Sequence, residues 1–356
     1  MSDELGEEEI EVCATANEIQ STYPLATNLS VSGPFEDEDH ARGFGHAFIG
    51  SLQVIGQHIN LTDLDGVTIT GTYHETLLQI DRGLEGLRPL TASTIEDGVI
   101  GVAMAPAVLR DGLLKTHLIF DVNYVWHIAD PESEFFASAV HTIAHECGHV
   151  EVHTALDQAL PGRILRHRYA DYIEQYREEV IDACFQEYGA TRLSAGFGLN
   201  PIDGYRQTFL TALADTDAAA NGFISAYRTH GDIDRVLLEV PPLYANLIKW
   251  ASYLIGTMHG LGIMVSDQQG LADALSDHWF ADYFARLEAA YAELWERLGQ
   301  WESASEFDGL GDIAIEVLEA GGMFLSRNEE DGIRVDIPFR ANNTPNYGLL
   351  SLLRGI

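Results

Sequence analysis

The chain is short of basic residues, and above all of lysine. Among its 356 residues are 55 acidic and 20 basic side chains, which give a formal net charge of −35, and its two lysines are Lys115 and Lys249. Nucleic acids and anionic membranes bind through surfaces rich in lysine and arginine. We therefore expect neither as a main partner, and we attribute the shortage of lysine to coding bias or a salt-adapted habitat.

Cysteines and long apolar runs are also scarce. The three cysteines, Cys13, Cys147 and Cys184, lie far apart, so the sequence predicts neither a disulfide framework nor a cysteine-rich zinc knuckle. The acidic N-terminus has no apolar segment of the kind found in secretory signal peptides. The longest mostly apolar stretch, residues 246–265, includes Lys249 and three glycines and is a poor membrane span. These absences favour a soluble cytoplasmic protein.

The apolar pattern predicts an α+β fold. Hydrophobic residues make up 46% of the chain and charged residues 21%, which is enough for a full core. Strand-like segments come first and helical patterns follow, so we expect a small mixed or antiparallel N-terminal sheet before a largely helical C-terminal half. The expected strands are residues 67–73, 98–105 and 116–126, with a turn at Asp111 and Gly112 between the last two. The expected helices are residues 41–61, 75–84, 169–195, 205–218, 242–258 and 272–301, with one more that opens at 130–132 and is broken at 161–162.

The most informative segment is His145-Glu146-Cys147-Gly148-His149, an H-E-x-x-H pattern on the helix that opens at residues 130–132. Residues four apart share one helix face, with Cβ atoms about 5–6 Å apart, so both imidazoles can reach one Zn²⁺ at about 2.0–2.1 Å. Glu146 then projects toward the open coordination position, where it can take a proton from water. The sequence therefore predicts a zinc site with Glu146 as its catalytic base.

The same helix carries further histidines at fourfold spacing, His141 and His153. The four histidines cannot share one ion, because at about 1.5 Å of rise per residue the outer two are about 18 Å apart. Only the pair His145 and His149 has a glutamate directly after its first member, so we select this pair. Gly148 inside the helix costs about 1 kcal/mol relative to alanine, and the close approach of another backbone would explain its presence.

A third ligand is expected from the helix predicted over residues 169–195. Its acidic candidates are Glu178, Glu179, Asp182 and Glu187. At about 100° per residue, Glu187 falls on the apolar line of this helix, whereas Glu178 lies on the face opposite to Glu187. An acid aimed into an apolar face needs a partner, either a metal ion or an arginine, because burying it alone is expensive. We predict that Glu187 is the third metal ligand and keep Glu179 as the alternative.

Other polar residues have weaker assignments. Tyr176, Tyr188 and Arg192 could stabilise an oxyanion, but packing or a surface position explains each of them more simply. We interpret His153 as a solvated histidine near the end of its helix, in preference to a partner of the metal ligands. His259 lies in a mostly apolar helical segment, and we interpret it as a hydrogen-bonded core histidine.

Two segments resemble a known family. Residues 141–153 (HTIAHECGHVEVH) resemble the metal-binding helix of the zinc-peptidase family named after ImmA and IrrE, which reads F-T-x-A-H-E-x-G-H-x-x-x-H, and residues 187–195 (EYGATRLSA) are similar to its E-x-x-A-x-x-F-A segment. Members of this family are gluzincins, in which two histidines and a distant glutamate bind zinc. The resemblance covers about residues 100–195. It implies a peptidase whose ligands are His145, His149 and Glu187 and whose base is Glu146.

The leading functional hypothesis is a zinc-dependent peptidase that acts on a peptide or protein, with the strand over residues 98–105 holding the substrate backbone. The alternative is a catalytically silent metallopeptidase-like module with a binding or regulatory role. A third hypothesis is an assembly or phage-encoded protein in which the motif is accidental. The oligomeric state is left open.

The expected organisation has three parts. Residues 1–40 form an acidic arm and lead-in, of which the first ten are frayed in solvent. Residues 41–200 form a zincin-like metallopeptidase core, with the sheet packed on the H-E-x-x-H helix. Residues 201–356 form a mostly helical region with a terminal hairpin around Asp331 and Gly332.

Overall fold

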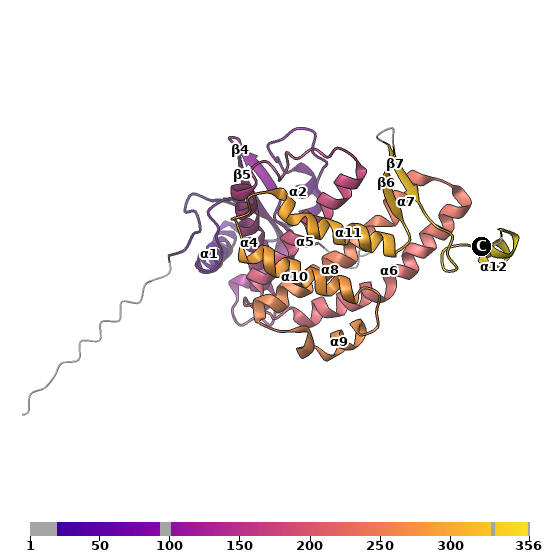
Figure 1. Cartoon of the computed structure of the whole chain (residues 1–356). Coiled ribbons are helices and arrows are strands. Elements are labelled where there is room, and N and C mark those ends of the chain that lie inside the picture. Colours follow the sequence, from indigo (N-terminus) through magenta and orange to yellow (C-terminus); the bar gives the residue numbers. More distant parts are fainter. Residues whose placement is uncertain (1–19, 93–100, 329–331, 355–356) are drawn as a thin grey trace, which may run out of the picture.

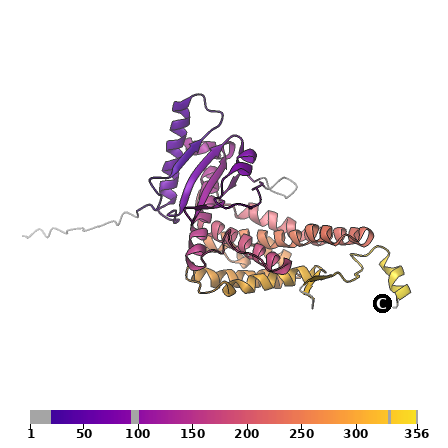
Figure 2. The same cartoon turned by 90° about the horizontal axis from the view of Figure 1, so that it is seen from above.

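The computed structural model describes residues 20–92, 101–328 and 332–354, and it has the expected α+β class. A mixed sheet with its covering helices forms one layer, and a group of long helices lies beside it (Figure 1). Seen from above, the two layers are distinct, and the C-terminal helix lies at the far end of the helical layer (Figure 2). The segment predicted to fray lies outside the described residues.

The N-terminal layer is built on a mixed sheet. Within the described ranges its strands are β1 (Asn28–Val31), β2 (Leu64–Thr70), β3 (Ala103–Met104), β4 (Ala107–Arg110) and β5 (Leu113–Asp121). The order is β1-β2-β5-β3, and β4 also pairs with β5. β1 is parallel to β2 and β2 to β5, whereas β3 and β4 run antiparallel to β5. Because β4 pairs with the first part of β5 and β3 with a later part, β3 lies at an edge of the sheet.

The strand predicted over residues 116–126 is too long at its C-terminal end. The Asp121 carboxylate accepts a hydrogen bond from the backbone N–H of Asn123, at 2.9 Å, and thereby caps a short helix, α3 (Val122–Val125). The strand therefore ends at Asp121, and residues 122–126 are helical.

Asp111 and Gly112 form the expected turn between β4 and β5. Both have positive φ angles, 51° and 82°, as a two-residue turn between antiparallel strands requires. The strand predicted over residues 98–105 pairs only at Ala103–Met104, and its first residues lie outside the described part of the chain. On the sheet face that carries Ile119 lies α2 (Tyr73–Gln79), shorter than the predicted helix over residues 75–84.

α1 (Glu38–Ile55) connects β1 to β2 and packs on the opposite face of the sheet. It begins at Asp37, whose carboxylate accepts a hydrogen bond from the His40 N–H at 2.8 Å. The predicted helix over residues 41–61 is found here, although it ends at Ile55. The apolar residues of this range, which follow a spacing close to 3.6, are buried: Phe44, Phe48, Leu52, Ile55 and Ile59.

α4 (Phe136–Ala159) carries the H-E-x-x-H motif and contributes to two apolar cores. The predicted opening of this helix at residues 130–132 is wrong, because Asp130 caps a turn instead: its carboxylate accepts from the Glu132 N–H at 3.1 Å. The helix contributes Ala139, Ile143, Ala144, Cys147 and Val150 to the sheet core and Val152, Ala155 and Leu156 to the helical core.

α5 (Tyr172–Ser194) is held tightly between α4 and α8 (Pro241–Leu261). A Cβ atom at Gly148 of α4 would lie 2.8 Å from the Cα atom of Ala190, so the two backbones approach closely only because this residue has no side chain. This is the close approach that the glycine in the motif suggested. On the other side, a Cβ atom at Gly256 of α8 would clash with the carbonyl oxygen of Tyr188. The positions of the three helices relative to one another are therefore closely fixed.

The long helix predicted over residues 272–301 is interrupted. α9 (Gln269–Leu275) ends before a turn, and α10 (Ala281–Glu296) begins after it. In the turn, the His278 Nδ1 atom accepts a hydrogen bond from the backbone N–H of Phe280, and the Phe280 side chain is fully buried. The chain therefore bends to place this aromatic ring in the helical core.

The rest of the C-terminal half is mostly helical, as expected. α6 (Ile202–His230) is longer than the predicted helix over residues 205–218. The predicted hairpin is present as an antiparallel pair of strands, although Asp331 in its turn lies outside the described residues. The remaining elements are α7 (Ile233–Glu239), α11 (Asp308–Ala320), β6 (Phe324–Arg327), β7 (Ile333–Asp336) and α12 (Tyr347–Arg354), with 3₁₀ helices at Trp126–Ala129, Val265–Asp267 and Ala304–Phe307.

None of the helices within the described ranges combines the length and the apolar character needed to cross a bilayer.

Residues 28–31, within the predicted lead-in, form a strand of the sheet. The division of the chain at residues 40 and 200 stays a prediction.

Candidate metal centre

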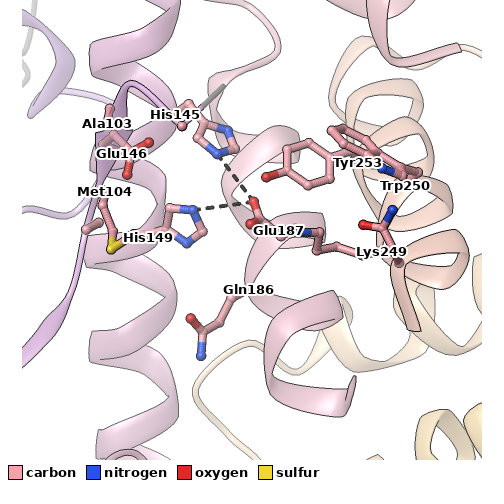
Figure 3. Close-up of a pocket in the computed structure, with 13 residues that line it drawn as sticks. Ala103, Met104, His145, Glu146, His149, Gln186, Glu187, Lys249, Trp250 and Tyr253 are labelled. Atoms are coloured by element: carbon pink, nitrogen blue, oxygen red, sulfur yellow. Dashed lines mark ion pairs between the residues drawn. The ribbon is translucent and has the colours of Figure 1, made fainter. Parts of the chain in front are cut away.

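The three predicted ligands converge between α4 and α5. His145 and His149 project from α4, and Glu187 projects toward them from α5 (Figure 3). The Glu187 Oε2 atom lies 3.4 Å from His145 Nε2 and 3.5 Å from His149 Nε2. The three ligand atoms all lie within 4.8 Å of one another, and the described part of the chain contains no second group of this kind.

These distances fit a tetrahedral metal ion. Ligand atoms bonded to zinc at about 2.0–2.1 Å lie about 3.3 Å apart along the edge of a tetrahedron. The two nitrogen–oxygen distances are close to that edge and longer than ordinary hydrogen bonds, which peak near about 2.9–3.0 Å. The Glu187 Oε2 atom is also buried and has no hydrogen-bond partner among the described residues, which is costly unless a cation compensates it. Two imidazoles and a carboxylate suit zinc and also manganese or iron.

Glu187 is ionised in spite of its burial. Burial raises the pKa of its carboxyl group, but the contacts with His145 and His149 outweigh burial and hold the pKa well below the usual range. Tyr253 of α8 supports the arrangement, because its ring stacks on that of His145, with centroids 5.8 Å apart and planes 13° apart. Its hydroxyl group points toward the Glu187 side chain (Figure 3), and burial together with the nearby Glu187 carboxylate raises the pKa of Tyr253. Such contacts fix the orientation of metal ligands.

The alternative ligand, Glu179, is not part of this group. Its Oε1 atom accepts a hydrogen bond from Gln175 Nε2 at 2.8 Å. The other two acidic candidates pair with an arginine. The Arg163 Nη2 atom lies 2.5 Å from Glu178 Oε2 and 2.9 Å from Asp182 Oδ1. Of the four acids considered, the structure brings only Glu187 to the histidine pair.

The flanking histidines of α4 face other partners. His141 Nε2 lies 3.5 Å from the Tyr205 hydroxyl group. The interpretation of His153 as a solvated histidine is wrong: it is buried and bridges Thr116 and Gln186, with both hydrogen bonds at 2.9 Å. Burial, more than any other cause, lowers the pKa of His153 to about 4. His153 is therefore uncharged near neutral pH, and its two hydrogen bonds connect α4 to β5 and to α5.

Glu146 lies beside the histidine pair and faces β3. Its side chain is 7% exposed and lines a cavity together with Ala103 and Met104 (Figure 3). Burial raises the pKa of Glu146 to about 7; of the weaker influences, His145 lowers it and Glu187 raises it. A carboxyl group with a pKa near neutrality can both accept and release protons at physiological pH.

The candidates for oxyanion stabilisation lie elsewhere. The Tyr188 hydroxyl group contacts His259 Nδ1 at 2.9 Å and accepts a hydrogen bond from Arg192 at 2.6 Å. The Tyr176 hydroxyl group faces the carbonyl oxygen of Pro241 at 3.5 Å. The hydroxyl groups of both tyrosines therefore have partners away from the cavity. His259 is hydrogen-bonded, as expected, but it is partly exposed and does not lie fully within the core.

The cavity in front of the ligands has a volume of about 280 Å³ and is bounded by β3, α4, α5 and α8. Sequence reasoning missed the contribution of α8, which consists of Asn246, Lys249, Trp250 and Tyr253. The signal was present, because spacings of three, four and seven residues place these polar and aromatic side chains on one face of an otherwise apolar helix.

Comparisons with protein families, with curated proteins and with solved structures found no match to this chain. The resemblance to the family named after ImmA and IrrE thus stays a prediction based on two short segments.

Proposed function

We propose that the chain is a zinc-dependent peptidase of the gluzincin type. The observation that carries the proposal is the convergence of His145, His149 and Glu187 on one wall of a cavity that Glu146 also lines. Structural zinc sites are usually closed by four protein ligands, whereas catalytic sites have three and keep one position open. A group of three with a cavity in front of it is the catalytic arrangement.

The ligand group, Glu146 and Tyr253 have different roles in the proposed reaction. Zinc bound there supplies a Lewis acid, which polarises a carbonyl group and makes water more acidic. Glu146 takes a proton from water in the cavity and gives it to the leaving amine, because its carboxylate lines the cavity beside the ligand group. Tyr253 keeps the rings and carboxylate of the ligand group in place through its stacking on His145 and its contact with Glu187.

The substrate backbone is expected to lie along β3. Ala103 and Met104 line the cavity, and within the described residues β3 pairs with β5 on one side only. The free edge of a strand offers N–H and C=O groups to an extended peptide. A peptide added there passes the ligand group and Glu146.

Metal analysis and peptide hydrolysis by the purified full-length chain test the proposal. We expect about one zinc ion per chain and cleavage within a mixed peptide library. Glu146→Gln keeps the size of the side chain but cannot accept the proton, so it should retain zinc and lose about 100-fold or more in rate. Glu132→Gln, the same substitution in the exposed turn before α4, is the matched control and should keep the full rate.

Each other outcome points to a different function. Zinc binding without hydrolysis of any peptide would favour the silent binding or regulatory module. Undiminished cleavage by Glu146→Gln would reject the proposed base. Absence of metal after purification without chelators would favour the accidental motif and reject the proposal as a whole.

A further inference from the structure

Lys249 places a cationic side chain beside the candidate metal centre. It is one of two lysines in a chain with a net charge of −35, and it lines the cavity in front of the ligands. Its side chain extends from α8 toward Glu187 (Figure 3). Its Nζ atom lies 5.9 Å from the centroid of the Trp250 ring, at the outer limit of a cation–π interaction. No ion pair joins it to a described acid, so its counter-charge is expected from a ligand.

A second cavity, of about 570 Å³, adjoins the first. Both cavities are lined by Asn246 and Lys249, so the two spaces meet at these residues. Most of the side chains that line the second cavity are apolar or aromatic, and its charged side chains besides Lys249 are Arg88 and Glu179. Its apolar walls come from α5, α7 and α8 and include Tyr172, Tyr176, Val180, Leu237, Pro241 and Ala245.

A carboxylate next to an apolar side chain complements this arrangement. Ammonium and carboxylate groups form charge-assisted hydrogen bonds that are about twice as strong as neutral ones. Glu146, Glu187 and the negative charge of the whole chain repel an anion, so a carboxylate is accepted only where a cation offsets them. Lys249 is the cationic side chain that lines both cavities, and the adjoining apolar walls can bury the neighbouring side chain of the ligand.

We propose that Lys249 is a specificity residue whose ammonium group binds a carboxylate of the peptide substrate, while the second cavity takes the apolar side chain beside that carboxylate. This inference rests on the proposed function and names the class of its substrate. The carboxylate has two sources, the C-terminus of a peptide or the side chain of aspartate or glutamate. The C-terminal source would make the protein a carboxypeptidase, and the side-chain source an endopeptidase that prefers acidic sequences.

Peptide binding tests the inference without requiring hydrolysis. Two pairs of acetylated tetrapeptides are titrated into full-length Glu146→Gln protein. Both members of the first pair end in phenylalanine, and they differ in whether the C-terminus is a free acid or an amide. Both members of the second pair have an amidated C-terminus, and they differ in whether aspartate or asparagine lies beside phenylalanine. We expect the charged member of one pair to bind about 10- to 100-fold more tightly, and that pair identifies the source of the carboxylate. Lys249→Met should abolish the preference, and Lys249→Arg should keep most of it.

The controls separate this inference from the proposed hydrolysis. Lys115→Met, the same change at the other lysine, on β5, should leave the preference intact. Three outcomes would each overturn the inference: equal dissociation constants within both pairs, no binding at all, or a preference that survives Lys249→Met. A preference that survives Lys249→Met would mean that the carboxylate is held elsewhere, such as at the metal. Lys249→Gln replaces the methionine variant if that variant does not fold. A preference that depends on Lys249 in a protein that cleaves no peptide supports the inference and counts against the proposed function alone.

Discussion

At the scale of single residues, the metal centre depends on one acid that approaches two histidines from another helix. His145 and His149 are fixed by their spacing on α4, but Glu187 reaches them only because α5 packs closely on α4. In the part of the chain that the structure describes, its buried Oε2 atom has no hydrogen-bond partner, so its carboxylate is stable there only with a positive charge nearby. Glu187 and its support by Tyr253 are therefore the most informative positions to change.

Removing the charge of Glu187 should weaken metal binding most. Changes to a residue next to a metal ligand typically lower metal affinity by about 10- to 100-fold. For Glu187→Gln we expect a larger loss of zinc affinity, because a ligand itself is lost. Competition with a chromogenic chelator measures the affinity. Glu179→Gln is the matched control on the same helix and should bind zinc like the unchanged chain. A metal affinity that depends on Glu179 and not on Glu187 would reverse the assignment of the third ligand.

The Tyr253 hydroxyl group is expected to orient the ligands without binding the metal. Tyr253→Phe keeps the ring on His145 but removes the contact with Glu187, and we expect zinc affinity to fall about 10- to 100-fold. Tyr188→Phe removes a hydroxyl group that contacts His259 and Arg192, so it should leave zinc affinity unchanged. Equal affinities of the two variants would contradict the supporting role of Tyr253.

At the scale of elements, three helices position the site, and two glycines decide how closely they approach. Gly148 allows α5 to approach α4, and Gly256 allows α8 to approach α5. The ligands come from the first contact, and Tyr253 and Lys249 reach the cavity because of the second. Loosening either contact should therefore affect both folding and metal binding.

Gly148→Ala should destabilise the chain although alanine is the better helix former. The added Cβ atom would lie 2.8 Å from Ala190 Cα, and overpacking of this kind costs about 1–3 kcal/mol. Gly43→Ala in α1 is the matched control: its Cβ atom has no neighbour within 4 Å, so the free energy of unfolding should rise by about 0.5–1 kcal/mol. Urea denaturation measures both. An increase for Gly148→Ala would show that the helices tolerate a wider separation.

Local patterns predicted the elements well where one residue type determines the local geometry. The motif spacing placed His145 and His149 on one face, and the Asp111–Gly112 pair predicted the hairpin turn, because both depend on near neighbours. The start of α4 and the break between α9 and α10 were missed, since a cap at Asp130 and the burial of Phe280 decide them.

The contribution of α8 to the site was harder to predict from the sequence. Its polar and aromatic side chains are spaced along one helix face, but their meeting with α4 is a tertiary contact between distant segments. The apolar face of the helix over residues 169–195 did favour Glu187, because that argument needs only the period of a helix.

At the scale of the whole molecule, α4 contributes to two apolar cores, and the candidate site lies along the same helix. The sheet core and the helical core both include side chains of this helix. The cavity has walls from both parts, β3 on one side and α8 on the other. A substitution that loosens the packing between the sheet part and the helical part should therefore alter the shape of the cavity more than the packing of either core.

The acidic surplus should make stability depend on salt. A net charge of −35 destabilises the compact state through self-repulsion, which salt screens as the Debye length falls from about 10 Å at 0.1 M to about 3 Å at 1 M. We expect the melting temperature to rise as sodium chloride increases over that range. Differential scanning calorimetry measures the change, with sucrose as the uncharged control. A melting temperature that is constant or falls would show that the acids are already compensated.

The most direct test of the metal centre is a crystal structure of the full-length chain with anomalous data collected on both sides of the zinc absorption edge. We expect one anomalous peak between α4 and α5, at about 2.0–2.2 Å from the two imidazole Nε2 atoms and from the carboxylate that α5 contributes. Absence of such a peak in crystals grown with zinc, or a peak bound by other side chains, would contradict the account.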